Sequence, residues 1–113
     1  DADELAFVLE NLVSNAVRAM GGAPRRELRM TWSVDHGLLV LDTIDTGCGI
    51  AEDDWERILD SRYSSRDGGG AGLFRSRHLL RRHGGRIWVA SSAPAAGTCM
   101  RMELPLARPE DSA

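Results

Sequence analysis

Three polar side chains share one face of the first predicted helix. Asn11, Asn15 and Arg18 are four and three residues apart, a spacing that places them on successive helical turns. Amide oxygens are hard ligands that suit Mg²⁺, and an arginine one turn further along can bind a phosphate. The same spacing also fits an ordinary solvated polar face. On the helix alone, both interpretations stay open.

A second candidate site follows directly after a predicted strand, in the segment DTGCGI (residues 45–50). A carboxylate at Asp45 can accept a hydrogen bond from an amino group, while Gly47 and Gly49 let a ligand approach the backbone closely. Thr43, two residues before Asp45, is expected on the same side of the strand. Aspartate and glycine are also common in strand-ending turns for conformational reasons, so this segment too has two interpretations.

A third candidate is a run of small residues before a predicted helix, formed by Gly68, Gly69, Gly70, Ala71, Gly72 and Leu73. Glycine-rich backbone that leads into a helix N-terminus favours anions, because unpaired N–H groups and the helix dipole both attract phosphate. The run lacks the GxxxxGK[ST] pattern and is therefore not a P-loop. A flexible linker is the alternative. Gly97-Thr98, between the last two predicted strands, is by itself an ordinary loop.

Hydrophobic periodicity predicts the elements that must position these residues. Helices are expected over residues 3–20, about 53–59 and about 72–83, and strands over 27–34, 38–44, 86–92 and 99–105. The strands occur in pairs joined by short connections, rather than alternating singly with helices. This order predicts an α+β protein, a two-layer α/β sandwich with a mixed, mostly antiparallel sheet covered on one face by about three helices.

Length and composition exclude several classes of protein. The chain has 113 residues, of which 42% are hydrophobic and 27% charged, which fits one domain over residues 1–113 with a frayed tail at 106–113. No apolar run approaches the roughly 20 residues that cross a bilayer. Cys48 and Cys99 form no CxxC motif, which argues against a disulfide scaffold and a thiolate zinc site. A reducing, cytoplasmic setting is expected, without membrane contact by this domain; whether its parent protein is anchored in a membrane stays open.

Charge is unevenly distributed along the chain. The formal net charge is −3, yet eight arginines lie between Arg57 and Arg86. Such a stretch could bind nucleic acid, a phosphorylated ligand or an acidic protein. Arg77, Arg81 and Arg82 can simply face solvent from the predicted helix, so no nucleic-acid partner is expected.

The motifs gain specificity from their order along the chain. The series NLVSNA, DTGCGI, RYSSR, GGGAGL, HGGRIWVAS, GT and ELP resembles the catalytic ATP-binding domain of sensor histidine kinases, in the group that also contains gyrase, Hsp90 and MutL ATPases. The resemblance extends from about Leu5 to Pro105 and implies the Bergerat fold. It also implies a domain that binds ATP and Mg²⁺ and donates the γ-phosphoryl to a histidine in two-component signalling.

The resemblance implies a role for each matching residue. Asn15 matches the Mg²⁺-coordinating asparagine, Asn11 the polar position one turn before it, and Arg18 a basic position that faces the phosphates. Asp45 matches the aspartate that binds the adenine amino group. The remaining matches are Gly47, Gly49 and Ile50 in the adenine turn, Arg66 near the γ-phosphate, Gly68, Gly69, Gly70, Ala71, Gly72 and Leu73 in the phosphate loop, and Thr98 in the last box. The catalytic residues implied are Asn11, Asn15 and Arg66.

The resemblance also implies partners that this sequence does not contain. None of His36, His78 and His83 lies in the family's His-Glu acceptor context. The phosphoryl acceptor is therefore expected on a separate dimerisation domain, and the next acceptor on the receiver domain of a response regulator. Without its acceptor domain this piece is expected to be monomeric and inactive as a kinase.

Two alternatives follow from departures within the motifs. The family's GTGLGL is GGGAGL here, which suits a degenerate member that binds nucleotide weakly and serves as an interaction module. The other alternative is an ATPase, or a serine kinase of the anti-sigma-factor type. Position 11 is asparagine, whereas gyrase-like ATPases use a glutamate there to activate water, and this difference argues against the second alternative.

Overall fold

The computed structural model describes residues 2–60, 69–93 and 95–106. Its elements, in chain order, are α1 (Ala2–Ala19), β1 (Leu28–Asp35), β2 (Leu38–Asp45), the 3₁₀ helices η1 (Glu52–Asp54) and η2 (Arg57–Leu59), α2 (Gly69–Arg82), β3 (Arg86–Ser92) and β4 (Thr98–Pro105). The RYSSR motif (residues 62–66, which includes Arg66), Gly68 and the tail after Leu106 lie outside the described residues.

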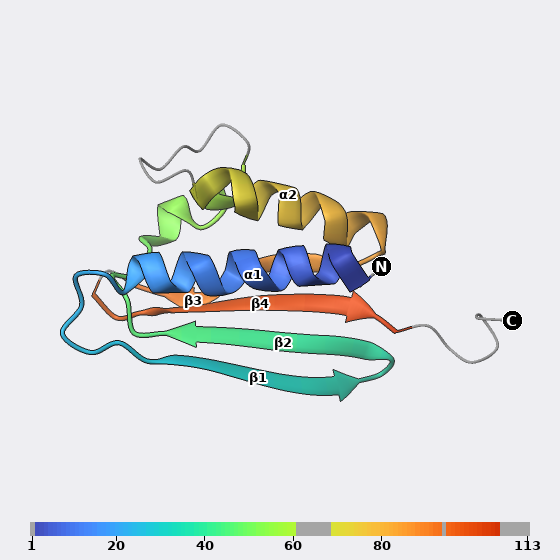
Figure 1. Cartoon of the computed structure of the whole chain (residues 1–113), viewed down its shortest axis with the longest axis horizontal. Helices are drawn as coiled ribbons and strands as arrows, with labels where there is room; N and C mark the ends of the chain where they lie inside the picture. Colours follow the sequence, from blue (N-terminus) through green and yellow to red (C-terminus); the bar gives the residue numbers. More distant parts are fainter. Residues whose placement is uncertain (1, 61–68, 94, 107–113) are drawn as a thin grey trace, which may run out of the picture.

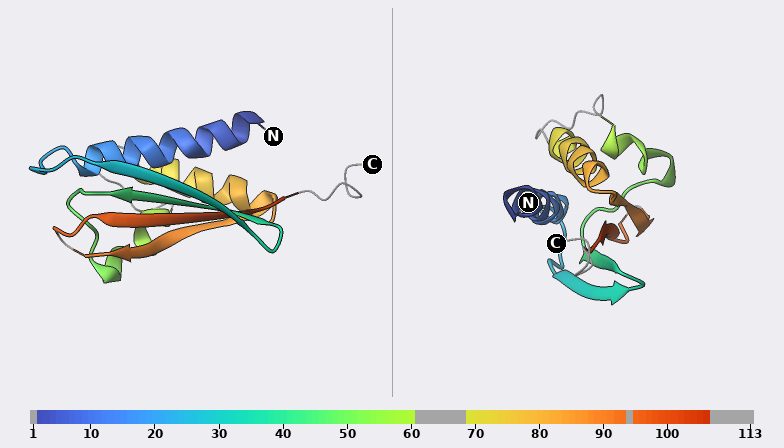
Figure 2. Two further views of the ribbon diagram at one scale, coloured as in Figure 1. Left: turned by 90° about the horizontal axis from the view of Figure 1, so that it is seen from below. Right: turned by 90° about the vertical axis from the view of Figure 1, so that its right-hand side faces the viewer.

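The strands form one four-stranded sheet in the order β1-β2-β4-β3, and each neighbouring pair is antiparallel. Both α-helices lie on the same side of this sheet, as Figure 1 shows, and the views of Figure 2 agree. The α+β class and the two-layer arrangement predicted from the sequence are confirmed. β2 and β4 are the two central strands, so their ends meet beneath the helices.

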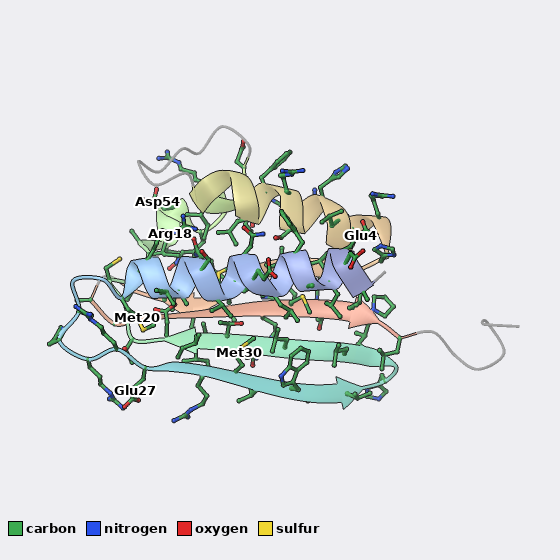
Figure 3. The ribbon with its side chains drawn as sticks, in the orientation of Figure 1. Glu4, Arg18, Met20, Glu27, Met30 and Asp54 are labelled. Carbon is green, nitrogen blue, oxygen red and sulfur yellow. The ribbon has the colours of Figure 1, made fainter. Side chains whose placement is uncertain are left out.

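The amphipathic pattern of α1 explains why it forms and where it packs. Val8, Leu12 and Ala16 are its buried residues, spaced four apart along one stripe. Acidic side chains occupy its first turn and Arg18 its last, which suits the helix dipole at both ends. Figure 3 shows Glu4 at the beginning of the helix and Arg18 near its end. The predicted helix over 3–20 is confirmed.

The first hairpin has a turn that only certain residues accept. β1 and β2 are joined by His36 and Gly37, whose φ angles are 49° and 78°. Two consecutive left-handed residues are the mark of a type I′ hairpin turn, in which glycine is strongly favoured. The hairpin predicted around residues 35–37 is thus confirmed.

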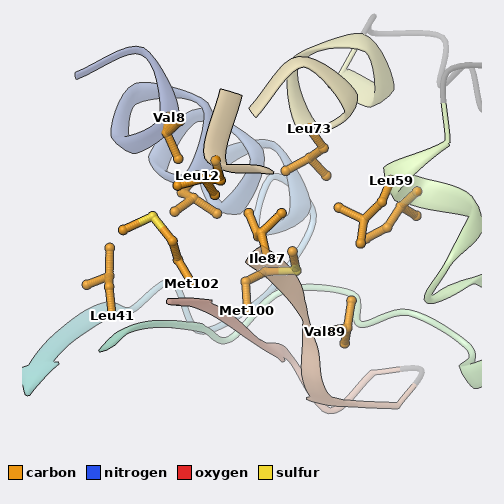
Figure 4. Packing of buried hydrophobic residues seen from close by; sticks show 11 residues of the cluster. Val8, Leu12, Leu41, Leu59, Leu73, Ile87, Val89, Met100 and Met102 are labelled. Carbon is orange, nitrogen blue, oxygen red and sulfur yellow. The ribbon is translucent and has the colours of Figure 1, made fainter. Parts of the chain in front are cut away.

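The hydrophobic core lies between the helices and the inward face of the sheet (Figure 4). Leu41 of β2 and Met102 of β4 are opposite each other in the sheet and completely buried. Side chains alternate between the faces of a strand, so Thr43 and Asp45 share the inward face with Leu41. Two polar residues of β2 therefore extend the core towards one end of the sheet.

Two segments differ from the sequence-based expectation. Residues 52–59 form two short 3₁₀ helices instead of one helix, because their amides bond three residues back: Asp54 N–H donates to Ala51 O at 2.8 Å and Leu59 N–H to Glu56 O at 3.1 Å. The second difference is the beginning of α2, which is at Gly69 and not near residue 72. The low helix propensity of glycine argued against those first positions.

Candidate functional site

Asp45 ends β2 as a buried carboxylate on the inward face of the sheet. Its side chain is only 7% exposed, and its Oδ1 accepts a hydrogen bond from Gly47 N–H at 2.8 Å. Burial raises the pKa of Asp45 above its usual range, while hydrogen bonds from the backbone amides of Gly47 and Thr98 partly oppose that rise. Asp45 is thus a desolvated acceptor that backbone donors hold in place.

The loop between β3 and β4 brings Thr98 to Asp45. The two residues are directly opposite in the antiparallel register of β2 and β4. Gly97 precedes Thr98 with a φ of 79°, and its α-carbon lies against the backbone carbonyl of Asp45. A side chain at position 97 would overlap that carbonyl, so glycine is required here by both conformation and space.

Ser92, which the sequence analysis did not select, organises this end of the sheet. Its Oγ accepts from Ile50 N–H at 2.7 Å and donates to Gly97 O at 2.9 Å. A hydroxyl has a single hydrogen, so Thr98 Oγ1, 2.8 Å away, must be the donor in their contact. The lone pairs of Thr98 stay available. The available signal was the position of Ser92 at the end of a strand, just before the Gly97-Thr98 loop.

The DTGCGI turn packs directly against the end of α1. Cys48 N–H donates to Ala19 O at 2.9 Å, and a Cβ built on Gly47 would lie 2.6 Å from the same carbonyl oxygen. Gly49 has a φ of 76°, which favours glycine. The glycines that suggested close ligand approach therefore also allow the turn to contact the helix.

Asn11 and Asn15 lie on the part of α1 that faces α2. Asn11 Nδ2 donates to Phe7 O at 2.8 Å, and its Oδ1 lies against the α-carbon of Gly72, where a Cβ would overlap it. Asn15, one turn further, is half-buried and makes no hydrogen bond with the described part of the chain. Its amide is available to a ligand. Arg18 is exposed one turn later and interacts with neighbouring groups.

The glycine run forms the first turn of α2. Gly69, Gly70, Ala71 and Gly72 begin the helix, and Leu73 anchors it with 2% exposure. The first turn of a helix leaves backbone N–H groups without intrahelical partners. The predicted glycine loop is therefore in part a helix N-terminus beside Asn11. Arg66 and Gly68, assigned to the same loop, lie outside the described residues.

Helix α1 thus contacts both other regions: its end, at Ala19, packs against the turn that follows Asp45, and its Asn11 lies against Gly72 at the beginning of α2. Residues 1–108 match the family described as histidine kinase-, DNA gyrase B- and HSP90-like ATPases. The chain belongs to this ATPase family. The resemblance to a histidine-kinase ATP-binding domain, drawn from the motifs, is confirmed, and the family's domain binds ATP.

Relatives of this histidine-kinase-like ATPase domain include a regulatory histidine kinase and a sensor protein. The methanogenesis regulatory histidine kinase FilI of Methanothrix harundinacea is 34% identical over 100 residues, which are 86% of this chain and 11% of FilI. Sensor protein FixL of Bradyrhizobium diazoefficiens is 35% identical over 109 residues, or 95% of this chain and 21% of FixL. The chain thus spans less than a quarter of either relative.

Solved structures share the fold of this ATPase domain. The catalytic domain of histidine kinase ThkA matches with a TM-score of 0.81 and 26% identity, over 93% of this chain and 69% of that one. Full-length ShkA, solved in complex with AMPPNP, matches with a TM-score of 0.80 and 28% identity, over 92% of this chain and 22% of ShkA.

Two further findings concern the described part of this ATPase domain. It contains no group of three or more His, Cys, Asp or Glu side chains that could hold a metal ion. Its helices are all too short or too polar to cross a membrane.

Proposed function

We propose that this domain binds Mg²⁺-ATP and donates the γ-phosphoryl group to a histidine on a separate domain, as part of two-component signalling. The observation that carries the proposal is the buried Asp45, held by two backbone amides and adjacent to Thr98, at the end of the sheet that contacts α1. ShkA, which shares this fold over 22% of its chain, was solved in complex with AMPPNP, and this supports nucleotide binding as the function of the domain.

Asp45 and Thr98 suit the adenine base. An ionised carboxylate only accepts hydrogen bonds, and the 6-amino group of adenine only donates them. Thr98 Oγ1 gives its hydrogen to Ser92 and so offers lone pairs, to the base directly or through one ordered water. Ser92 is a positioning residue in this proposal, because it fixes Thr98 and the turn at Ile50 without contacting the nucleotide.

The phosphates would lie between α1 and the beginning of α2. Backbone N–H groups in the first turn of α2, at Gly69–Gly72, would offset phosphate charge together with Arg18 and the predicted contacts of Arg66 and Gly68. Asn15 would hold Mg²⁺, which when bound neutralises charge on the phosphate oxygens. In the transfer step an imidazole nitrogen of the acceptor forms a bond to the γ-phosphorus, the bond to the bridging oxygen breaks, and ADP leaves.

Partners are inferred from the length of the relatives. FilI and FixL are much longer than this chain, which leaves room in such proteins for the acceptor-histidine dimerisation domain. A response-regulator receiver domain would be the next acceptor. We expect this chain, when isolated, to be a monomer. In the parent protein we expect the domain to lie in the cytoplasm, with no nucleic-acid or membrane contact of its own.

The reaction can be tested by mixing this chain with γ-labelled ATP and purified acceptor-histidine domains of sensor kinases. The proposal predicts acid-labile, base-stable label on the acceptor, as expected for phosphohistidine. Acid-stable label would instead identify a serine kinase, and release of free phosphate without an acceptor would identify an ATPase. If the chain bound no nucleotide at millimolar concentration, the remaining interpretation would be a degenerate family member that serves as an interaction module.

Asn15→Ala should remove the contribution of Mg²⁺ to nucleotide affinity. The half-buried amide has no described hydrogen bond to lose, so its truncation should affect the metal and hardly the fold. We expect affinity for AMPPNP with Mg²⁺ to fall roughly 10- to 100-fold, the equivalent of about 1.5–3 kcal/mol for a charge-assisted contact. Affinity without Mg²⁺ should hardly change.

The control for this titration is Ser14→Ala, a truncation at the neighbouring, exposed position of α1. Consecutive helical residues point in directions about 100° apart, so Ser14 does not share the face of Asn15. If both variants kept the Mg²⁺ dependence, Asn15 would not be the ligand.

A further inference from the structure

Thr43 contains a buried polar group that the fold does not satisfy. Its side chain is 1% exposed, and its Oγ1 has no hydrogen-bond partner among the described residues. Buried hydroxyl groups in native proteins nearly always have a partner, so an exception requires an explanation. Thr43 is the one buried side-chain polar atom of this kind in the described part of the chain.

The surroundings of Thr43 explain why no partner is available. Its cross-strand neighbours are Met30 of β1 and Met100 of β4, whose side chains offer only a weakly accepting sulfur. β2 is paired on both sides, so its backbone groups are already used in the sheet. The protein thus holds a hydroxyl group in an apolar setting on the inward face, towards the helices.

The position of Thr43 relative to Asp45 suggests what the hydroxyl group binds. The two residues are two apart on β2, so they lie on the same face with their α-carbons about 7 Å apart. Asp45 is an acceptor at the end of the strand, and Thr43 adds a donor one step deeper. Adenine presents the complementary pair, an amino donor with ring-nitrogen acceptors on either side of it.

We propose that Thr43 is a specificity-determining residue for the base, with its hydroxyl group donating to a ring nitrogen beside the 6-amino group of adenine, directly or through one ordered water. This proposal rests on the proposed function, because it requires a nucleotide at Asp45. It goes further by naming a second polar contact that distinguishes 6-aminopurines from bases that lack this donor–acceptor pair.

Thr43→Val tests the proposal, because valine keeps the shape of threonine and removes only the hydroxyl group. Without nucleotide, the variant should melt a few degrees higher, since an unsatisfied buried group has been removed. Its affinity for ADP should nevertheless fall roughly 3- to 10-fold, as expected for one lost hydrogen bond. Opposite signs for stability and affinity distinguish binding from a structural role.

Two controls and two analogues sharpen the test. Thr43→Ser keeps the hydroxyl group and should retain most of the affinity, whereas Thr31→Val, the same change at an exposed position of β1, should alter neither quantity. Replacement of one ring nitrogen by C–H, in 1-deaza-ADP or 7-deaza-ADP, should identify the atom contacted. With the relevant analogue, the wild type and Thr43→Val should bind equally well.

Each outcome decides the proposal. If Thr43→Val melts higher but binds ADP within twofold of the wild type, the hydroxyl group serves the free protein alone and the proposal fails while the proposed function stands. If the wild type does not bind ADP at millimolar concentration, the proposed function itself fails. If Thr43→Val lost the same affinity relative to the wild type for ADP and for both deaza analogues, the contact to a ring nitrogen would also be overturned.

Discussion

Asp45→Asn should lower the affinity for ADP by about 100-fold, the equivalent of about 2.7 kcal/mol. Backbone amides of Gly47 and Thr98 donate to the side chain of Asp45 and would hold the oxygen of an asparagine. The new NH₂ group would then face the 6-amino group of adenine, so two donors would meet where a charge-assisted hydrogen bond is lost. Calorimetric titration with ADP measures the difference directly.

The matched control is Asp42→Asn on the same strand. Asp42 accepts from Arg101 at 2.7 and 2.9 Å on the opposite face of the sheet, away from the site. This variant should cost some stability and leave ADP affinity within about twofold of the wild type. Equal loss of affinity in both variants, or unchanged affinity in Asp45→Asn, would contradict the assignment of the base to Asp45.

The pH dependence of binding should follow the same carboxylate. Burial raises the pKa of Asp45, so its neutral form is favoured by folding and its charged form is disfavoured. As pH falls through this raised pKa, Asp45 becomes protonated, and its contribution to the stability of the nucleotide-free fold increases. The protonated side chain loses the charged acceptor that would bind the adenine amino group. We therefore expect ADP affinity to decrease at low pH in the wild type, with a much weaker dependence in Asp45→Asn.

Gly97→Ala should be the most destabilising single-methyl addition at the site, with a loss of about 3 kcal/mol in the free energy of unfolding. Alanine at a φ of 79° costs about 1–2 kcal/mol, because its Cβ approaches its own backbone. The new methyl would also overlap the backbone carbonyl of Asp45, and overpacking of this kind costs about 1–3 kcal/mol more. Urea denaturation of the nucleotide-free protein gives the loss.

Gly37→Ala is the control that separates the conformational cost of a positive φ from the cost of the overlap. Gly37 has a φ of 78°, nearly the same as Gly97, but a Cβ there would meet no atom within 4 Å. This control should therefore lose only the conformational cost, about 1–2 kcal/mol. If the two variants were destabilised equally, the close approach of the Gly97 loop to Asp45 would be wrong, and with it the placement of Thr98.

Much of the fold follows from local patterns in the sequence. The apolar residues of α1 recur every three to four positions, which predicts the helix, and its buried members Val8, Leu12 and Ala16 lie four residues apart. The His36-Gly37 turn between two apolar runs is a short-range hairpin signal. The segment around η1 and η2 was less predictable. Its few apolar residues, such as Ile58 and Leu59, are buried in the core, but they are too few to show the period of a helix.

The site was predictable only in part, for a physical reason. Periodicity places Asp45 at a strand end but does not give the register between β2 and β4 that sets Thr98 beside it. The contact between Asn11 and Gly72 and the hydrogen bond from Ile50 N–H to Ser92 Oγ join residues far apart in the sequence. Such contacts depend on tertiary packing, which single-sequence patterns do not encode.

The most direct test of a nucleotide site at this end of the sheet is an NMR titration of the ¹⁵N-labelled chain with Mg²⁺-AMPPNP. At 113 residues the chain is well suited to resolved amide spectra. We predict saturable shifts at the amides of Gly47 and Thr98 and at Gly69–Leu73, with little change in the His36-Gly37 turn. No shifts at millimolar nucleotide, or shifts confined to residues away from Asp45 and the beginning of α2, would contradict the account.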